Sequence, residues 1–141
     1  MSNDTAPAER RHALVQAHYA VENHHDLDAI MKTFAGQAEM LYNRQPFRDH
    51  DSIRTAHDYM GFAAAGAFEG LRTVAEHEHL TADEIVIEGR LFGRHVGEFQ
   101  GFAPTGRDVE LPFVAFYHFD RAGKLTSERV VMNLGPLATT G

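Results

Sequence analysis

Apolar residues recur with two different periods along the chain, and the change of period divides it into two regions. Residues 9–23 place apolar side chains at helical spacing, which predicts a first helix. A second, short helix follows its N-cap Asp26 and ends near Gly36. A short strand over residues 39–43 and a third helix over residues 51–60 complete the first region.

From residue 71 onward the apolar period changes to two, which is the period of a β-strand. Turn signals rich in Gly, Pro and Asp separate four predicted strands, over residues 71–80, 84–97, 108–119 and 124–133. Helices followed by strands indicate a single α+β domain, residues 1–141, with an antiparallel sheet. Because the third of these strands is apolar on both faces, we expect it to be central, with helices on one face and a partner subunit or a further layer on the other.

Symmetric hairpins between the last three strands place three polar residues in one row. Glu110 then lies opposite His95 on one side and opposite Asn133 on the other. A carboxylate beside a histidine on a mostly apolar face makes an acid–base pair, because burial and mutual charge tune both groups. We therefore predict that these three residues are catalytic. The alternative is a structural polar pair at the rim of the sheet, and a slip of one residue or a bulge would move one member to the other face.

The face that carries this row is predicted to line a pocket for a small hydrophobic molecule. The residues assigned to its wall are Leu91, Val114, Phe116, His118, Tyr19, Tyr42 and Tyr59. The alternative for the tyrosines is an ordinary core, which is the more frequent place of aromatic residues at such positions. The position of His118, near the far end of its strand, is also consistent with a hydrogen-bonded rim histidine.

Composition and charge exclude several classes of site. The chain has no cysteine, which excludes disulfides, a cysteine nucleophile and cysteine-ligated metals. Its net charge of −7 provides no basic surface for nucleic acid. No apolar run is long enough to span a membrane, and the first residues lack the apolar core of a secretory signal, so we expect a cytoplasmic protein.

The unusual feature is the ten histidines in 141 residues, since histidine is the side chain best suited to proton transfer near neutral pH. His77 and His79 share one strand face at a spacing that can bind a metal, but no third ligand follows nearby, which favours a plain exposed face. His18 and His57 lie on helix faces that can touch the core. Phosphate-binding loops, a nucleophile elbow and the HExxH motif are missing, and we predict no metal and no cofactor.

Three segments of the chain resemble the SnoaL-like polyketide cyclases of the nuclear-transport-factor-2-like superfamily: ENHHDLDAIMKTFA, GRLFGRHVGEFQGFAPTGR and FDRAGKLTSERVVMN. The resemblance implies a cone-shaped α+β barrel, in which N-terminal helices pack on a curved antiparallel sheet around a deep apolar pocket. It also implies a homodimer through the outer face of the sheet. The family's cyclases close a polyketide ester by an intramolecular aldol reaction without metal or cofactor.

One position departs from the family's pattern. The family's histidine matches His95, but the family's acid–base aspartate aligns with Asn133, and an amide cannot exchange a proton. Either His95 with Glu110 takes over the role of base, or the reaction differs, or the protein only binds a ligand.

We therefore expect a cofactor-independent acid–base enzyme acting on a small hydrophobic carbonyl compound, as a cyclase, isomerase or lyase. The alternative is a noncatalytic module for ligand binding or dimerisation. A further alternative is a reaction like that of the superfamily's epoxide hydrolases. The sequence does not support it, because it offers no second carboxylate for the group of residues that would activate a water molecule.

Overall fold

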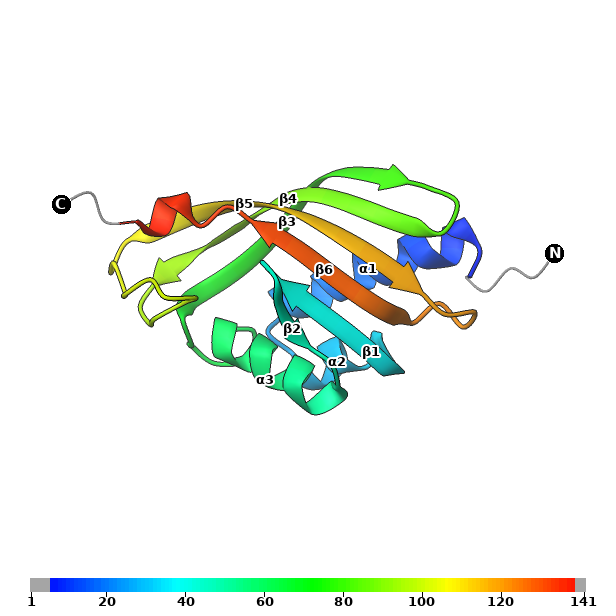
Figure 1. Cartoon of the computed structure of the whole chain (residues 1–141), viewed down its shortest axis with the longest axis horizontal. Coiled ribbons are helices and arrows are strands. Elements are labelled where there is room, and N and C mark those ends of the chain that lie inside the picture. The colour runs from blue at the N-terminus through cyan, green and yellow to red at the C-terminus, as the bar shows by residue number, and fades with distance from the viewer. Residues whose placement is uncertain (1–5, 139–141) are drawn as a thin grey trace.

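The computed structural model describes residues 6–138 (Figure 1). Its helices are α1 (Ala8–Asn23), α2 (Leu27–Met31) and α3 (His50–Met60), followed near the C-terminus by the short 3-10 helix η1 (Gly135–Leu137). Its strands are β1 (Phe34–Tyr42), β2 (Gln45–Phe47), β3 (Phe68–Leu80), β4 (Glu84–His95), β5 (Asp108–Phe119) and β6 (Leu125–Met132). The first five residues, which entered the expectation about a secretory signal, lie outside the described part. Within that part, no helix is long and apolar enough to cross a membrane.

The strands form one curved, open sheet in the order β2-β1-β6-β5-β4-β3. Neighbouring strands are antiparallel except β1 and β6, which run parallel. β5 lies in the interior of the sheet between β4 and β6, as its two-sided apolar pattern predicts. Figure 1 shows the long strands arching over the helices, which lie on the concave side. The fold is the predicted cone-shaped α+β architecture.

Local sequence signals explain where the first elements begin and end. Asp26 caps α2 as predicted, since its side chain accepts a hydrogen bond from the N–H of Ala29 at 3.0 Å. The helix is shorter than predicted, because the chain turns after Met31 and enters β1, which includes Gly36. α3 begins earlier than predicted, because Asp49 forms a capping box with Ser52.

The concave face of the sheet is the buried face. On β5 it carries side chains that are 0–6% exposed, namely Leu111, Phe113, Ala115 and Tyr117. Leu91 of β4 lies opposite Leu111 on this face and is buried. Val114, Phe116 and His118 project from the outer face, so the prediction that they line the same pocket wall as Leu91 is wrong.

The predicted row of three catalytic residues does not form, because the register between β4 and β5 differs from a symmetric hairpin. Glu110 lies opposite Phe92, three residues before His95. A shift by an odd number of residues exchanges the two faces of a strand. His95 is therefore fully buried on the inner face, whereas Glu110 is exposed on the outer face.

The long loop between the two strands causes this shift. His95 leaves the sheet opposite Arg107, with its N–H donating to that residue's carbonyl at 2.9 Å. The residues between them form an irregular loop with its own bridge between Phe99 and Phe102. Asn133 follows the end of β6 and is exposed, and its backbone N–H donates to the carbonyl of Pro112.

Candidate functional site

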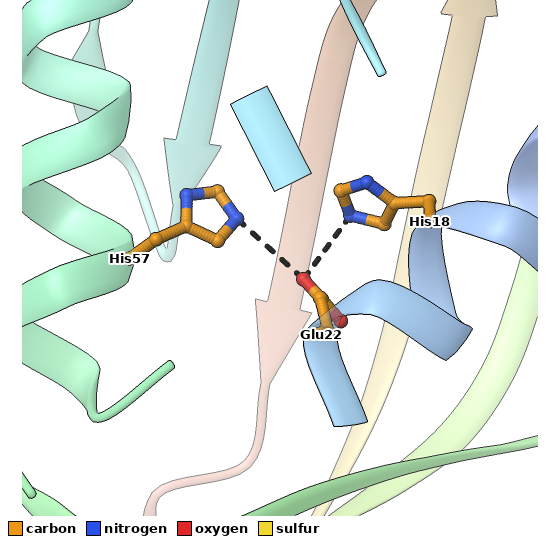
Figure 2. A group of neighbouring side chains, drawn as sticks. All are labelled: His18, Glu22 and His57. Atoms are coloured by element: carbon orange, nitrogen blue, oxygen red, sulfur yellow. Dashed lines mark ion pairs between the residues drawn. The ribbon is translucent and has the colours of Figure 1, made fainter. Parts of the chain in front are cut away.

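Four ionisable side chains meet in the interior, between the helices and the concave face of the sheet. We call them the buried cluster: His18 and Glu22 of α1, His57 of α3 and Glu128 of β6. Each is 0–3% exposed. Figure 2 shows both imidazole rings directed at the carboxylate of Glu22.

The periodicities of helix α1 and strand β6 explain why His18, Glu22 and Glu128 point into the interior. The buried stripe of α1 includes Val15, His18, Tyr19 and Glu22, which recur at the spacing of one helix face. His18 and Glu22 are one turn apart and therefore point to the same side. On β6, Glu128 alternates inward with Val130 and Met132, so a carboxylate occupies a core position of a strand.

His18 bridges the two carboxylates, and His57 faces both from a greater distance. Nε2 of His18 lies 3.1 Å from Oε2 of Glu22 and 3.1 Å from Oε2 of Glu128. Nε2 of His57 lies 3.5 Å from Oε2 of Glu22 and 3.8 Å from Oε1 of Glu128. The second pair of distances exceeds the length of an ordinary N–H···O hydrogen bond.

The hydrogen bonds of the Thr33 hydroxyl indicate which nitrogens of His18 carry a proton. Nδ1 of His18 lies 2.8 Å from this hydroxyl, which donates its single proton to the carbonyl of Ile30 at 2.6 Å. The hydroxyl must therefore accept from an Nδ1–H group. Because Nε2 faces two carboxylates, a proton is needed there as well, and His18 is an imidazolium.

The electrostatic environment agrees with this assignment. Burial by itself lowers the pKa of His18, but Glu22 and Glu128 together outweigh it and raise the pKa to about 10. Burial by itself raises the pKa of Glu22, but His18 and His57 outweigh it and lower the pKa to about 2. His18 and Glu22 therefore form an ion pair at neutral pH.

A hydrogen bond within α3 orients the ring of His57. Its Nδ1 donates to the carbonyl of Ile53 at 2.8 Å, within α3, which turns Nε2 toward the carboxylates. Nε2 of His57 and Oε1 of Glu128 are both buried, and neither has a hydrogen-bond partner within residues 6–138. Unpartnered polar atoms are uncommon in a protein interior and often mark a site that acts on a ligand.

Glu22 and Glu128 face an inner cavity of about 20 Å³, which is room for about one water molecule. Its polar wall includes the phenol groups of Tyr19 and Tyr117, which share a hydrogen bond of 2.6 Å. Burial raises the pKa of both phenols well above the ordinary range, so both remain neutral. Thr73 adds a buried hydroxyl that has no partner within the described residues.

An outer cavity of about 360 Å³ lies between α3, the β1–β2 hairpin and the loop after β4. Its wall consists of Tyr42, Gln45, Phe47, Thr55, Ala56, Tyr59, Met60, Glu98, Phe99 and Gln100. Tyr42 lines both cavities, so its side chain lies between the outer space and the buried cluster. Tyr59 is 47% exposed at the rim, where its hydroxyl donates to the carbonyl of Glu98.

The predicted wall residues divide into two groups. Tyr19, Tyr42 and Leu91 line the inner cavity and Tyr59 lines the outer one. His118 instead lies on the outer face, where its Nε2 donates to the carboxylate of Glu84 at 2.8 Å.

The three residues predicted to be catalytic lie apart from the buried cluster. His95 stacks on Phe68, with 5.4 Å between the ring centroids, and its Nδ1 accepts from the N–H of Thr105. Burial lowers the pKa of His95, which favours the neutral ring. Glu110 pairs with Arg90 on the outer face. The side-chain oxygen of Asn133 accepts from the N–H of Gly135 at 2.9 Å.

The sequence contained a signal for the cluster that the sequence reasoning missed. The pair His18 and Glu22 occupies the core face of a helix, and Glu128 occupies an inward position between apolar strand residues. Polar groups at core positions are the informative exception to hydrophobic patterning. Their meeting with His57 depended on how α1, α3 and β6 pack.

The comparison with protein families finds one family. The model of the SnoaL-like polyketide cyclases matches residues 12–139, which is most of the chain. No curated protein matches the sequence.

Solved structures of related folds match almost the whole chain. A candidate SnoaL-like polyketide cyclase from Jannaschia sp. CCS1 has a TM-score of 0.78 at 20% identity, covering 94% of this chain and 92% of that one. AclR from Streptomyces galilaeus, described as a candidate hydroxylase, has a TM-score of 0.74 at 24% identity, covering 93% and 80%. The epoxide hydrolase/cyclase-like enzyme SalBIII of salinomycin pyran ring formation has a TM-score of 0.74 at 14% identity, covering 91% and 93%. At these identities the likeness establishes the fold.

Proposed function

Because the chain belongs to the SnoaL-like polyketide cyclase family, we propose that it is an acid–base enzyme acting on a small hydrophobic carbonyl compound. The reaction class is an intramolecular aldol closure, as in polyketide cyclases, or a related isomerase or lyase reaction. Each of these reactions begins with removal of a proton from the carbon next to a carbonyl. The observation that carries the proposal is the pair of buried carboxylates, Glu22 and Glu128, on the wall of the inner cavity.

Glu128 is the proposed base. Its Oε2 is held by His18, whereas its Oε1 has no hydrogen-bond partner within residues 6–138 and is available to accept a proton. General acid–base action by a positioned group contributes about 10²–10⁴-fold to a rate. Glu22, paired with His18 at 3.1 Å, remains a carboxylate and balances the charge of the imidazolium.

The hydroxyl groups of the inner cavity are the proposed donors to the developing enolate oxygen. The phenols of Tyr19 and Tyr117 and the hydroxyl of Thr73 line the same space as Glu128. A donor that is already oriented toward the developing charge is worth roughly 10²–10³-fold in rate.

The outer cavity is the proposed binding place for the body of the substrate. Its volume of about 360 Å³ lies within the roughly 300–1,000 Å³ range of small-molecule pockets. The reacting end would pass Tyr42 to reach the carboxylates, because Tyr42 lines both spaces.

The small volume of the inner cavity favours one second candidate function. At about 20 Å³ it admits no substrate without movement of Tyr42. Noncatalytic binding of a hydrophobic molecule in the outer cavity alone needs no such movement.

Exchange of the α-proton tests the proposal without knowledge of the natural substrate. The protein is incubated in D₂O with a series of hydrophobic β-keto esters, and deuterium incorporation is followed by NMR. We expect the wild type to accelerate exchange of at least one ester, and Glu128→Gln to lose about 10²-fold or more of that acceleration. Glu110→Gln makes the same chemical change on the outer face and should leave the rate unchanged.

Two results would count against the enzyme. One is an exchange rate in Glu128→Gln equal to that of the wild type, provided that circular dichroism shows the variant to be folded. The other is binding of the esters without acceleration of exchange by the wild type, which would support the noncatalytic binding module.

A further inference from the structure

We propose that the buried cluster binds a divalent transition-metal ion through Nε2 of His18, a carboxylate oxygen of Glu22 and Nε2 of His57. Glu128 lies beside these ligands, with its Oε2 3.1 Å from Nε2 of His18. The proposal goes beyond the acid–base function and does not depend on it. It also departs from the prediction of no metal that the sequence supported.

The spacing of the four groups is compatible with a bound metal ion. In a tetrahedral site with bonds of about 2.0–2.1 Å, neighbouring ligand atoms lie about 3.3–3.4 Å apart. The nitrogen–oxygen separations in the buried cluster are 3.1, 3.1, 3.5 and 3.8 Å. Charge-assisted N–H···O hydrogen bonds are shorter, at about 2.7–2.9 Å. The ligand atoms of His18, Glu22 and His57 all lie within 4.8 Å of one another.

Both histidines are oriented as metal ligands are. The Nδ1 atom of His18 bonds to the hydroxyl of Thr33 at 2.8 Å, and the Nδ1 atom of His57 bonds to the carbonyl of Ile53 at 2.8 Å. A metal-binding histidine typically donates its second N–H to an oxygen acceptor in this way, which fixes the tautomer and the direction of the ring. In both residues Nε2 is the nitrogen that points into the cluster (Figure 2).

Nε2 of His57 is a buried atom whose missing hydrogen bond a metal ion would explain. Nδ1 donates to the carbonyl of Ile53, so Nε2 is the nitrogen left to bind an ion. It has no hydrogen-bond partner within residues 6–138, although it lies 3.5 and 3.8 Å from oxygens of Glu22 and Glu128 in a fully buried place. An ion between Nε2 and these carboxylates would give all three groups a partner.

The donor atoms indicate which metals fit. Two imidazole nitrogens with one or two carboxylate oxygens suit Zn²⁺, Fe²⁺ and Mn²⁺, whereas Mg²⁺ and Ca²⁺ prefer oxygen ligands alone. Imidazole binds a metal ion through an unprotonated nitrogen, so metal binding at His18 competes with protons. An ion in this position would polarise a bound carbonyl next to Glu128, which keeps its role as the base.

Zinc binding to the full chain tests the inference in the absence of any substrate. The protein is freed of metal with a chelator, dialysed, and titrated with ZnCl₂ in a calorimeter, and the bound metal is measured by mass spectrometry. We expect one ion per chain, a higher melting temperature with Zn²⁺ than without it, and ligand-field absorption bands when Co²⁺ replaces Zn²⁺. The heat measured in buffers of different ionisation enthalpy should show the release of a proton.

Variants separate this site from adventitious binding at the surface. Glu22→Gln and His57→Gln should each lose at least tenfold in affinity. His79→Gln removes an exposed histidine that pairs with Glu88 and should keep the wild-type affinity and stoichiometry. Loss of binding in His79→Gln, with binding retained in His57→Gln, would overturn the inference.

The wild type decides the question even if a variant does not fold. A metal-free wild type that binds no Zn²⁺ and gives no Co²⁺ absorption disproves the site, whatever its activity. Conversely, the protein could bind one metal ion per chain and yet accelerate proton exchange on none of the esters. That result would support the metal site and contradict only the enzyme proposal. The two proposals therefore have separate outcomes.

Discussion

Nε2 of His18 lies 3.1 Å from Oε2 of Glu128, although 110 residues separate the two in the sequence. The contact joins the first helix to the last strand beneath the concave face of the sheet. Removing one partner of a buried ion pair commonly destabilises a protein by about 3–5 kcal/mol, yet the intact pair stabilises little compared with apolar packing. A charged group kept in this position at such a cost points to function, which is the role proposed here for the cluster.

The metal-free protein should be most stable between about pH 4.5 and 6.5. The pKa of His18 is raised from 6.5 to about 10, so its stabilising contribution is complete below pH 6.5 and is lost as the pH rises toward 10. The pKa of Glu22 is lowered from 4.5 to about 2, so its contribution is complete above pH 4.5 and is lost as the pH falls toward 2. Urea unfolding across this range, in the presence of a chelator, measures the profile.

A variant without the imidazole supplies the control for this profile. In His18→Gln the decline of the unfolding free energy between pH 6.5 and 10 should become shallower. An identical alkaline slope in both proteins would show that His18 is not charged in the folded state.

Glu110→Gln should change the unfolding free energy by no more than about 0.5 kcal/mol. Glu110 is 46% exposed and pairs with Arg90, which is 42% exposed and also binds Glu76 on the outer face. Pairs of this kind contribute about 0–1 kcal/mol, because water and salt screen them. Urea unfolding measures the change. A large loss of stability or of activity would show that Glu110 has a structural or catalytic role.

Gly89→Ala should destabilise the protein by about 1–3 kcal/mol through overpacking. A Cβ atom at Gly89 would lie 2.7 Å from Cζ of Phe113 and would also clash with the carbonyl oxygen of Val74. Gly36→Ala is the matched control, because nothing lies within 4 Å of its added Cβ. Thermal unfolding of the two variants should separate them clearly, and equal melting temperatures would contradict the packing on the inner face of β4.

Tyr117→Phe should slow α-proton exchange by about tenfold or more, while costing only about 0.5–1.5 kcal/mol of stability. The variant removes one hydroxyl of the 2.6 Å hydrogen bond with Tyr19, so the inner cavity has one donor fewer. Exchange measured by NMR and unfolding measured in urea report the two effects separately. Slower exchange that is matched by unfolding of the variant would assign Tyr117 a structural role only.

The outer face of the sheet is the proposed dimer interface. It carries Val131, which is 57% exposed, beside the half-buried Val114 and Phe116. We expect a dimer in sedimentation experiments, and Val131→Asp should shift it to the monomer, because an unpaired charge is costly to bury in an apolar contact. A monomeric wild type at micromolar concentration would contradict the proposal.

Sequence patterning predicted most of the elements, because local spacing and local caps decide them. The period of two defined four strands within a few residues of their observed bounds, and Asp26 caps α2 as expected. The bounds were wrong where a competing interaction decided them, as at Asp49, whose capping box starts α3 early. The short strand β2 was not predicted, because it forms only by pairing with β1.

By itself, the sequence determined the α+β architecture, the central place of β5 and the family of the chain. The tertiary structure decided which face of the sheet is buried. The loop after His95 shifts the register by an odd number of residues, and local periodicity cannot report such a shift. Only tertiary packing brought His18, Glu22, His57 and Glu128 together, because each lies on a different turn or element and their meeting is a property of the whole fold.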